Sequence, residues 1–151
     1  MAKYSGSGNQ NLATTAITVL TVGSNATTAN RNRTYELLVA DEGTPADNVV
    51  LHTFQRCTAL GTSTAVTGTK LDPSDRAAQA AVGENHTAGE PTYTANEELL
   101  EFALNTRATF RWVAAPGGEI VTPATVANGW GAKALHASAT TAWRVTALWE
   151  E

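Results

Sequence analysis

The chain of 151 residues contains little charge, few lysines and almost no cysteine. Only 16% of its residues are charged, against about 25% in ordinary globular domains, so its surface must be largely neutral and polar. The single cysteine, Cys57, permits neither an internal disulfide nor a cysteine-rich zinc site. It lies in a strand-like segment, where we expect the thiol to be packed and unreactive.

Long apolar runs are also missing. None approaches the roughly 18 residues that a membrane span needs, and the first four residues are followed by Ser and Gly rather than by an apolar segment. We therefore expect no membrane partner and no secretory signal.

Alanine and threonine are abundant, with 27 and 24 residues. Threonine is β-branched and favours strands, and few segments show helical spacing. A chain of this length buries roughly 68–70% of its unfolded surface, enough for one hydrophobic core. The sequence therefore predicts a single, mainly β domain of the β-sandwich or jelly-roll-like type.

Short segments with strand-like composition alternate with turns rich in Gly, Pro and Asn. The clearest is 142–150, in which Trp143, Val145, Ala147 and Trp149 share one face. The segment 84–94 reads as loop or edge strand. The predicted strands are 16–22, 33–40, 49–58, 65–71, 98–104, 109–114, 119–122 and 142–150.

One short helix is expected between Asp72 and Gly83. Asp72 can cap the first free amides, Pro73 suits the first helical position, and the following AAQAA segment favours helix. Gly83 would end it after about two turns.

The N-terminal residues differ from the rest in composition and charge. Residues 1–15 offer only Tyr4 and Leu12 as large apolar anchors, and residues 1–35 carry +3 while the remainder carries −7. So little apolar area does not offset the entropy of ordering, which predicts a flexible arm at 1–15 ahead of a domain at 16–151. Three basic residues are too few for a nucleic-acid tail, and we expect the arm to order on an acidic neighbouring protein subunit. Its predicted contact residues are Lys3, Tyr4, Asn9, Gln10, Asn11 and Leu12.

Signatures of catalysis and metal binding are weak. His52, His86 and His136 lie far apart without metal-ligand spacing, and neither a nucleophile elbow nor a phosphate-binding loop occurs. An acidic cluster at 97–101 could hold a carboxylate pair or calcium, but charges on the wet edge of a strand explain it more simply. We expect no catalytic residue, no metal and no cofactor, and so no enzyme.

The four tryptophans divide into two groups. Trp112 and Trp143 lie on alternating strand faces and are expected in the core. Trp130 is flanked by Gly129 and Gly131 in a predicted loop, where it would anchor a subunit contact or stack on a sugar ring. The candidate subunit-interface residues are Arg31, Arg33, Trp130 and Trp149.

Residues 45–131 resemble a group of small structural proteins encoded in the genomes of tailed bacteriophages, the capsid decoration or cement proteins. The most specific elements are the Leu-Asp-Pro turn at 71–73, Pro-Thr-Tyr-Thr-Ala at 91–95, the Arg-x-Thr-x-Arg-Trp-Val-Ala strand at 107–114 and the Pro-Gly-Gly-Glu turn at 116–119. None of these is a catalytic signature.

This resemblance implies a virion protein, made in the host bacterial cytoplasm, that binds the exterior of the capsid. Such proteins bridge adjacent capsomers, often as trimers, so the implied partners are the major capsid protein and further copies of the chain itself. Two alternatives stay open. A head-completion or tail structural protein would share the phage setting, and a carbohydrate-binding module would use an exposed Trp130.

Overall fold

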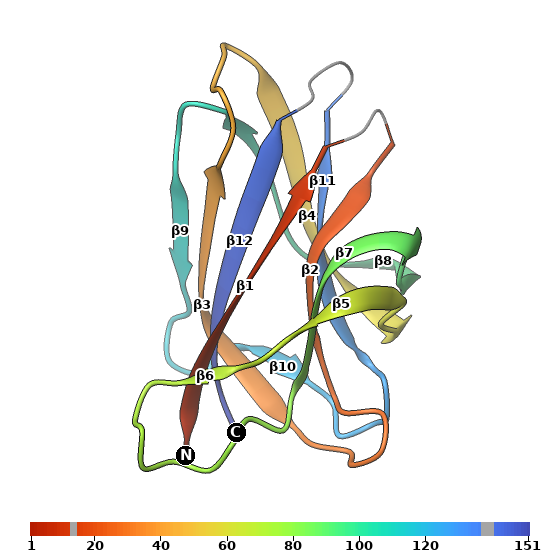
Figure 1. Ribbon diagram of the computed structural model, residues 1–151, viewed down its shortest axis with the longest axis vertical. Coiled ribbons are helices and arrows are strands. Elements are labelled where there is room, and N and C mark those ends of the chain that lie inside the picture. The colour runs from red at the N-terminus through yellow and green to blue at the C-terminus, as the bar shows by residue number, and fades with distance from the viewer. Residues whose placement is uncertain (13–14, 137–140) are drawn as a thin grey trace.

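All regular structure in the described residues is β, arranged in the computed structural model as two sheets that pack face to face (Figure 1). The described residues are 1–12, 15–136 and 141–151. No helix occurs among them, and so none with the length and hydropathy of a membrane span. The strands are β1 (Lys3–Asn11), β2 (Ile17–Gly23), β3 (Asn32–Asp41), β4 (Val49–Ala59), β5 (Thr62–Val66), β6 (Thr69–Lys70), β7 (Ala81–Gly89), β8 (Thr92–Asn105), β9 (Phe110–Val113), β10 (Ile120–Thr122), β11 (Gly129–Leu135) and β12 (Ala142–Glu150).

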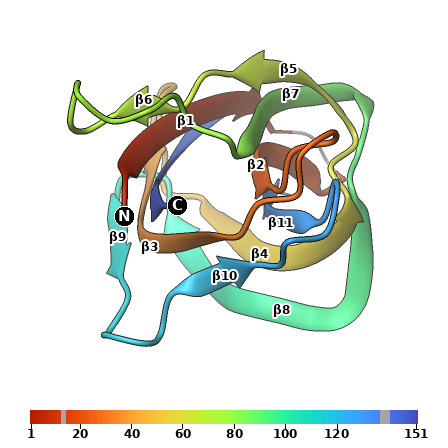
Figure 2. The same ribbon diagram turned by 90° about the horizontal axis from the view of Figure 1, so that it is seen from below.

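Both sheets are antiparallel, which confirms the prediction of a mainly β fold. The first sheet has the order β10-β3-β12-β1-β6, and β9 also pairs with β3. The second has the order β5-β7-β2-β11-β4-β8. Seen from below, the two sheets enclose the core and the long strand β8 lies at the outside of the second sheet (Figure 2).

The N-terminal segment differs from the flexible arm that composition predicts. Lys3–Asn11 forms β1, which pairs along its whole length with β12, and Tyr4 is completely buried. The inward positions after Tyr4 are Gly6 and Gly8, where a Cβ would come within 3.2 Å of the Trp149 ring and 2.7 Å of the Val19 carbonyl oxygen. Glycine lets the second sheet approach β1 closely, so the strand is held by backbone pairing and close packing rather than by its own apolar side chains.

The helix predicted between Asp72 and Gly83 is wrong. Asp72 does cap a turn, since its carboxylate accepts the Ser74 amide at 2.8 Å, but the chain then runs without helix into β7. Gln79 and Ala80 donate their amides to the Glu151 carboxylate instead. Two turns of helix are marginal alone, and these tertiary hydrogen bonds claim the backbone donors that a helix would need.

The core lies between the sheets and is rich in aromatic rings. Trp143 is fully buried, as predicted, and Trp112 is half-buried against the core. Trp130 is also fully buried, since residues 129–135 form β11 rather than a loop. Its indole nitrogen donates to the Thr34 hydroxyl at 3.2 Å across the two sheets.

Candidate interaction surfaces

A cavity of about 700 Å³ opens where the ends of several strands meet. It combines residues of both sheets with the connections β2–β3 and β10–β11. We call it the arginine cavity, because it contains two guanidinium groups and a single carboxylate. Its lining residues are Arg31, Arg56, Cys57, Thr58, Thr94, Glu97, Val121, Pro123, Ala124, Asn128 and Gly129.

Arg56 enters this cavity because of the alternation along β4. Val50, His52 and Phe54 are buried inward-facing positions, and Arg56 is the next on the same side. Its Nη1 donates to the Val121 carbonyl at 2.9 Å, which joins β4 of the second sheet to β10 of the first. The guanidinium is thereby fixed at the wall of the cavity.

The charges around Arg56 are incompletely paired. Glu97 lies 3.9 Å from its Nε, a loose ion pair whose carboxylate-bearing side chain is 48% exposed. Arg31, on the β2–β3 connection, is exposed and has no hydrogen-bond or ion-pair partner in the described part of the chain. The cavity therefore presents more cationic than anionic groups, in a protein with a net charge of −4.

Cys57 lies beside these groups but is not set up as a nucleophile. The residue is 3% exposed, and burial raises the pKa of its thiol to about 11. Because the thiolate is the reactive form, this environment suppresses attack on a substrate at neutral pH. The finding agrees with the expectation of a packed thiol.

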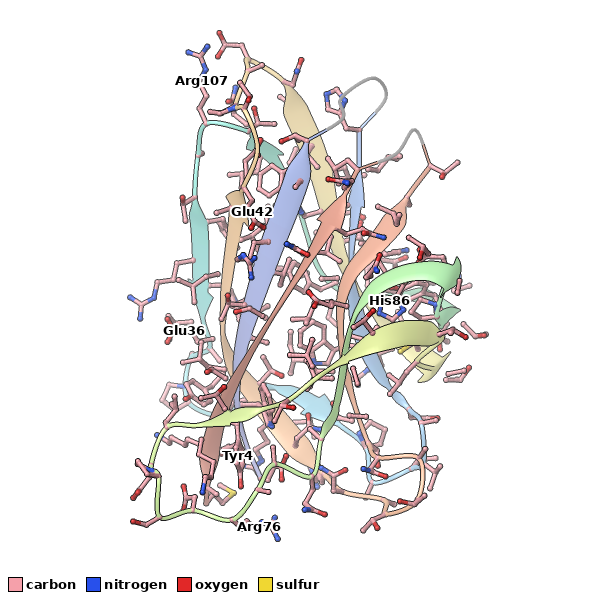
Figure 3. All side chains as sticks on the ribbon, in the orientation of Figure 1. Tyr4, Glu36, Glu42, Arg76, His86 and Arg107 are labelled. Atoms are coloured by element: carbon pink, nitrogen blue, oxygen red, sulfur yellow. The ribbon has the colours of Figure 1, made fainter. Side chains whose placement is uncertain are left out.

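A second surface is the outer face of the first sheet, formed by outward-facing residues of β1, β3, β9 and β12. Three ion pairs lie on or beside it: Arg111–Glu36 at 2.6 Å, Arg144–Glu42 at 2.8 Å and Arg33–Glu150 at 4.0 Å. Figure 3 labels two of the acids, Glu36 and Glu42. The hydrogen bond from Arg144 lowers the pKa of Glu42.

Half-buried apolar and hydroxyl side chains lie between these ion pairs. Leu148 pairs with Ser5 on one side of β12, while Leu38 lies opposite Thr146 on the other. Thr146 in turn shares a hydrogen bond of 2.6 Å with Ser7. The outer face thus has an uncharged centre and charged edges, an arrangement typical of protein interfaces.

The predicted arm residues are split between the surface and the core. Lys3 is exposed, with its ammonium 5.4 Å from the centre of the Tyr35 ring, and Asn11 is exposed as well. Asn9 is half-buried, and its backbone N–H donates to the Glu84 carboxylate at 3.0 Å. These three are the arm residues that a partner could reach.

Tyr4, Gln10 and Leu12 are buried, so their prediction as contact residues is wrong for this conformation. Tyr4 stacks on Trp149 at 5.9 Å, and its hydroxyl donates to the Arg76 carbonyl at 3.1 Å; Figure 3 labels Tyr4 and Arg76 at the same end of the sandwich. The alternation of β1 turns every second residue inward, which a count of apolar residues does not show.

Of the four predicted interface residues, two lie at the surface. Arg31 lines the arginine cavity and Arg33 lies on the outer face of the first sheet. Trp130 and Trp149 are both fully buried, so they are wrong as interface residues within this fold. Arg33 does not line the arginine cavity, although it lies opposite Val121 in the β3–β10 pair and Val121 does line it.

The acidic cluster on β8 does not form a carboxylate pair. Glu97 faces Arg56, whereas Glu98 accepts from the Gln55 amide at 3.2 Å and Glu101 accepts from the Thr53 hydroxyl at 2.9 Å. No group of three potential ligands is placed to hold a metal in the described ranges. Each acid thus has its own polar partner.

The three histidines, His52, His86 and His136, are all buried. Desolvation lowers the pKa of His52 to about 4 and also lowers that of His86. His86 lies 3.3 Å from the Thr21 hydroxyl, while His52 packs between Phe102 and Trp143. Both rings are therefore neutral at pH 7, and neither lines the arginine cavity.

Comparison with protein-family models, with curated proteins and with solved structures finds no match for this chain.

Proposed function

We propose that this chain is a structural virion protein that decorates the exterior of a bacteriophage capsid. In this role it cements the shell by bridging capsomers, as a homotrimer bound to the major capsid protein. The sequence motifs at 71–73, 91–95, 107–114 and 116–119 suggest the setting, and the outer face of the first sheet supports a binding role.

The observation that carries the proposal is the outer face of the first sheet. An uncharged centre with Leu38 and Leu148, bordered by three ion pairs, suits contact with a larger protein surface. β1 and β12 are paired from Lys3↔Glu150 to Asn11↔Ala142, which makes this face continuous. A trimer would present it three times, so that once one copy is seated the others bind at high effective concentration.

The state of the reactive side chains agrees with a binding role. The Cys57 thiol has a raised pKa, and His52 and His86 have lowered ones, each with burial as the main cause. These shifts favour the neutral form of each group at pH 7, which for Cys57 is the unreactive thiol. The proposed contacts are therefore assigned to residues at the surface.

We also propose that the two sheets have a jelly-roll-like connectivity. In the second sheet β11 lies between β2 and β4, so strands distant in sequence are neighbours, as in sandwiches built from Greek keys.

A point variant on the outer face tests the role directly. Arg111→Glu places a negative charge beside Glu36 and should strongly reduce co-sedimentation with empty capsids. Arg107→Glu is the matched control, because Arg107 is also an exposed arginine with one acidic partner but lies on the β8–β9 connection. Equal binding of the two variants and the parent chain would contradict the assignment of this face.

Copy number distinguishes decoration from the head-completion or tail alternative. Quantitative gels of purified particles should give hundreds of copies for a lattice-decorating protein, whereas about six or twelve would indicate a ring at one vertex. The carbohydrate-binding alternative relied on an exposed Trp130, and the burial of this side chain removes its basis.

A further inference from the structure

We propose that the arginine cavity binds a glutamate or aspartate side chain from an acidic segment of a neighbouring shell subunit. This inference rests on the proposed function, and it names the chemistry that the partner must supply. Arg31 and Arg56 would hold the carboxylate between them, with Glu97 turned toward solvent.

The two guanidinium groups of the cavity have unused hydrogen-bond donors. A guanidinium carries five N–H donors, and Arg31 uses none of them on a described residue. Arg56 uses Nη1 on the Val121 carbonyl, which leaves its other N–H groups for a ligand. Planar guanidinium groups match the geometry of a carboxylate and can bind it through two parallel hydrogen bonds.

Glu97 satisfies these donors poorly. It approaches Arg56 only to 3.9 Å, makes no hydrogen bond to Arg31, and about half of its side chain faces water. An exposed pair of this kind contributes little, so an incoming carboxylate can replace it at small cost.

The walls of the cavity suit the aliphatic part of an acidic side chain. Val121, Pro123 and Ala124 provide apolar surface beside the two guanidinium groups. A glutamate or aspartate side chain has a short aliphatic stem that can pack on such a surface and a terminal charge that reaches the donors. A nucleic acid is disfavoured, because its backbone requires many phosphate contacts and this cavity has two arginines.

The experiment is an NMR titration of the ¹⁵N-labelled full chain, with the arginine Nε–Hε resonances as the readout. The probes are acetyl-Glu-Glu-amide, the uncharged acetyl-Gln-Gln-amide as its matched control, and glutarate as a free dicarboxylate. We expect the Glu peptide to shift the Arg31 and Arg56 resonances, the Gln peptide to shift neither, and glutarate to bind at least fivefold more weakly than the Glu peptide.

Two variants assign the response. Arg31→Gln should weaken binding of the Glu peptide about tenfold, whereas Arg33→Gln should leave it unchanged, because Arg33 does not line the cavity and its guanidinium is paired with Glu150. Arg31 is exposed and unpaired, so its replacement does not threaten the fold.

Equal shifts with the Gln peptide, glutarate binding as tight as the Glu peptide, or unchanged binding by Arg31→Gln would each overturn the inference. The titration contains no capsid, so its failure leaves the proposed function standing. Failure of the chain to bind capsids while the Glu peptide still binds would instead refute the proposed function alone.

Discussion

The burial of His52 makes a quantitative prediction about acid stability. The ring is 1% exposed, stacks on Phe102 at 5.4 Å and meets the edge of Trp143 at 4.4 Å. Its Nε2 has no hydrogen-bond partner among the described residues. Burial lowers the pKa of His52 from 6.5 to about 4, because a charged imidazolium would lose its hydration there.

The sign of the effect follows from comparing folded and unfolded chains. The folded pKa lies below the unfolded value of 6.5, so the unfolded chain binds more protons as the pH falls below 6.5. The stabilisation from neutral His52 is therefore fully present above pH 6.5 and is lost progressively toward pH 4. Between pH 7.5 and 4.5 the loss amounts to about 2.5 kcal/mol of unfolding free energy.

Urea unfolding at pH 7.5, 6.5, 5.5 and 4.5 measures this loss. Carboxylates and His86 also titrate in this range, so the quantity to compare is the difference between the parent chain and His52→Phe. Phenylalanine keeps an aromatic ring against Phe102 but cannot bind a proton. We expect the parent midpoint to fall by roughly 1–2 M urea more than that of His52→Phe across this range.

Parallel pH profiles for the two proteins would refute the reasoning. An independent readout uses the parent chain alone: the His52 ring resonance should titrate near pH 4 in NMR spectra. A midpoint near 6.5 would show that the ring is hydrated in the folded protein.

Three further predictions concern packing. Burial raises the pKa of Cys57 from 9.0 to about 11, so the thiolate fraction at pH 8 falls about 100-fold. A disulfide reagent should therefore react at least 100-fold more slowly with the native chain than with the chain unfolded in guanidinium. Gly8→Ala places a Cβ 2.7 Å from the Val19 carbonyl oxygen and should lower the free energy of unfolding, measured in urea, by about 1–3 kcal/mol. The control Ser5→Ala, on the outer face of the same strand, should change it by less than about 0.5 kcal/mol. Deleting residues 2–11 removes β1 from the first sheet and should abolish cooperative unfolding in circular dichroism; a deleted chain as stable as its parent would restore the idea of a free arm.

Strands with alternating large apolar residues are the part of the fold that the sequence predicts well. The segments 16–22 and 142–150 correspond to β2 (Ile17–Gly23) and β12 (Ala142–Glu150) within one residue at each end. In β12 the alternation of buried and half-buried positions runs through the whole strand. Side-chain burial determines these strands, and burial leaves a period of two in the sequence.

β1 illustrates what such patterns miss. Its inward residues Tyr4, Gly6, Gly8 and Gln10 also recur with a period of two, but three of them are not large apolar residues. Their role depends on how near the opposite sheet lies, which is a tertiary property. The candidate site is likewise only partly predictable from the sequence. Arg31 can be chosen as a candidate from its charge alone, whereas Arg56 becomes a site residue only because β4 extends beyond the packed core.

The glycines beside Trp130 show how one sequence signal supports opposite readings. Gly129 and Gly131 suggest a loop, because glycine tolerates turn conformations. In the fold they belong to β11: a Cβ on Gly129 would collide with the backbone of β2, and one on Gly131 would collide with the Tyr93 ring. Glycine is therefore needed there for close approach, and the large ring between the two fills the space between the sheets. Flanking glycines thus accompany burial of Trp130 rather than exposure, and for this reason the proposed binding is assigned to the arginines and the outer sheet face instead of the tryptophans.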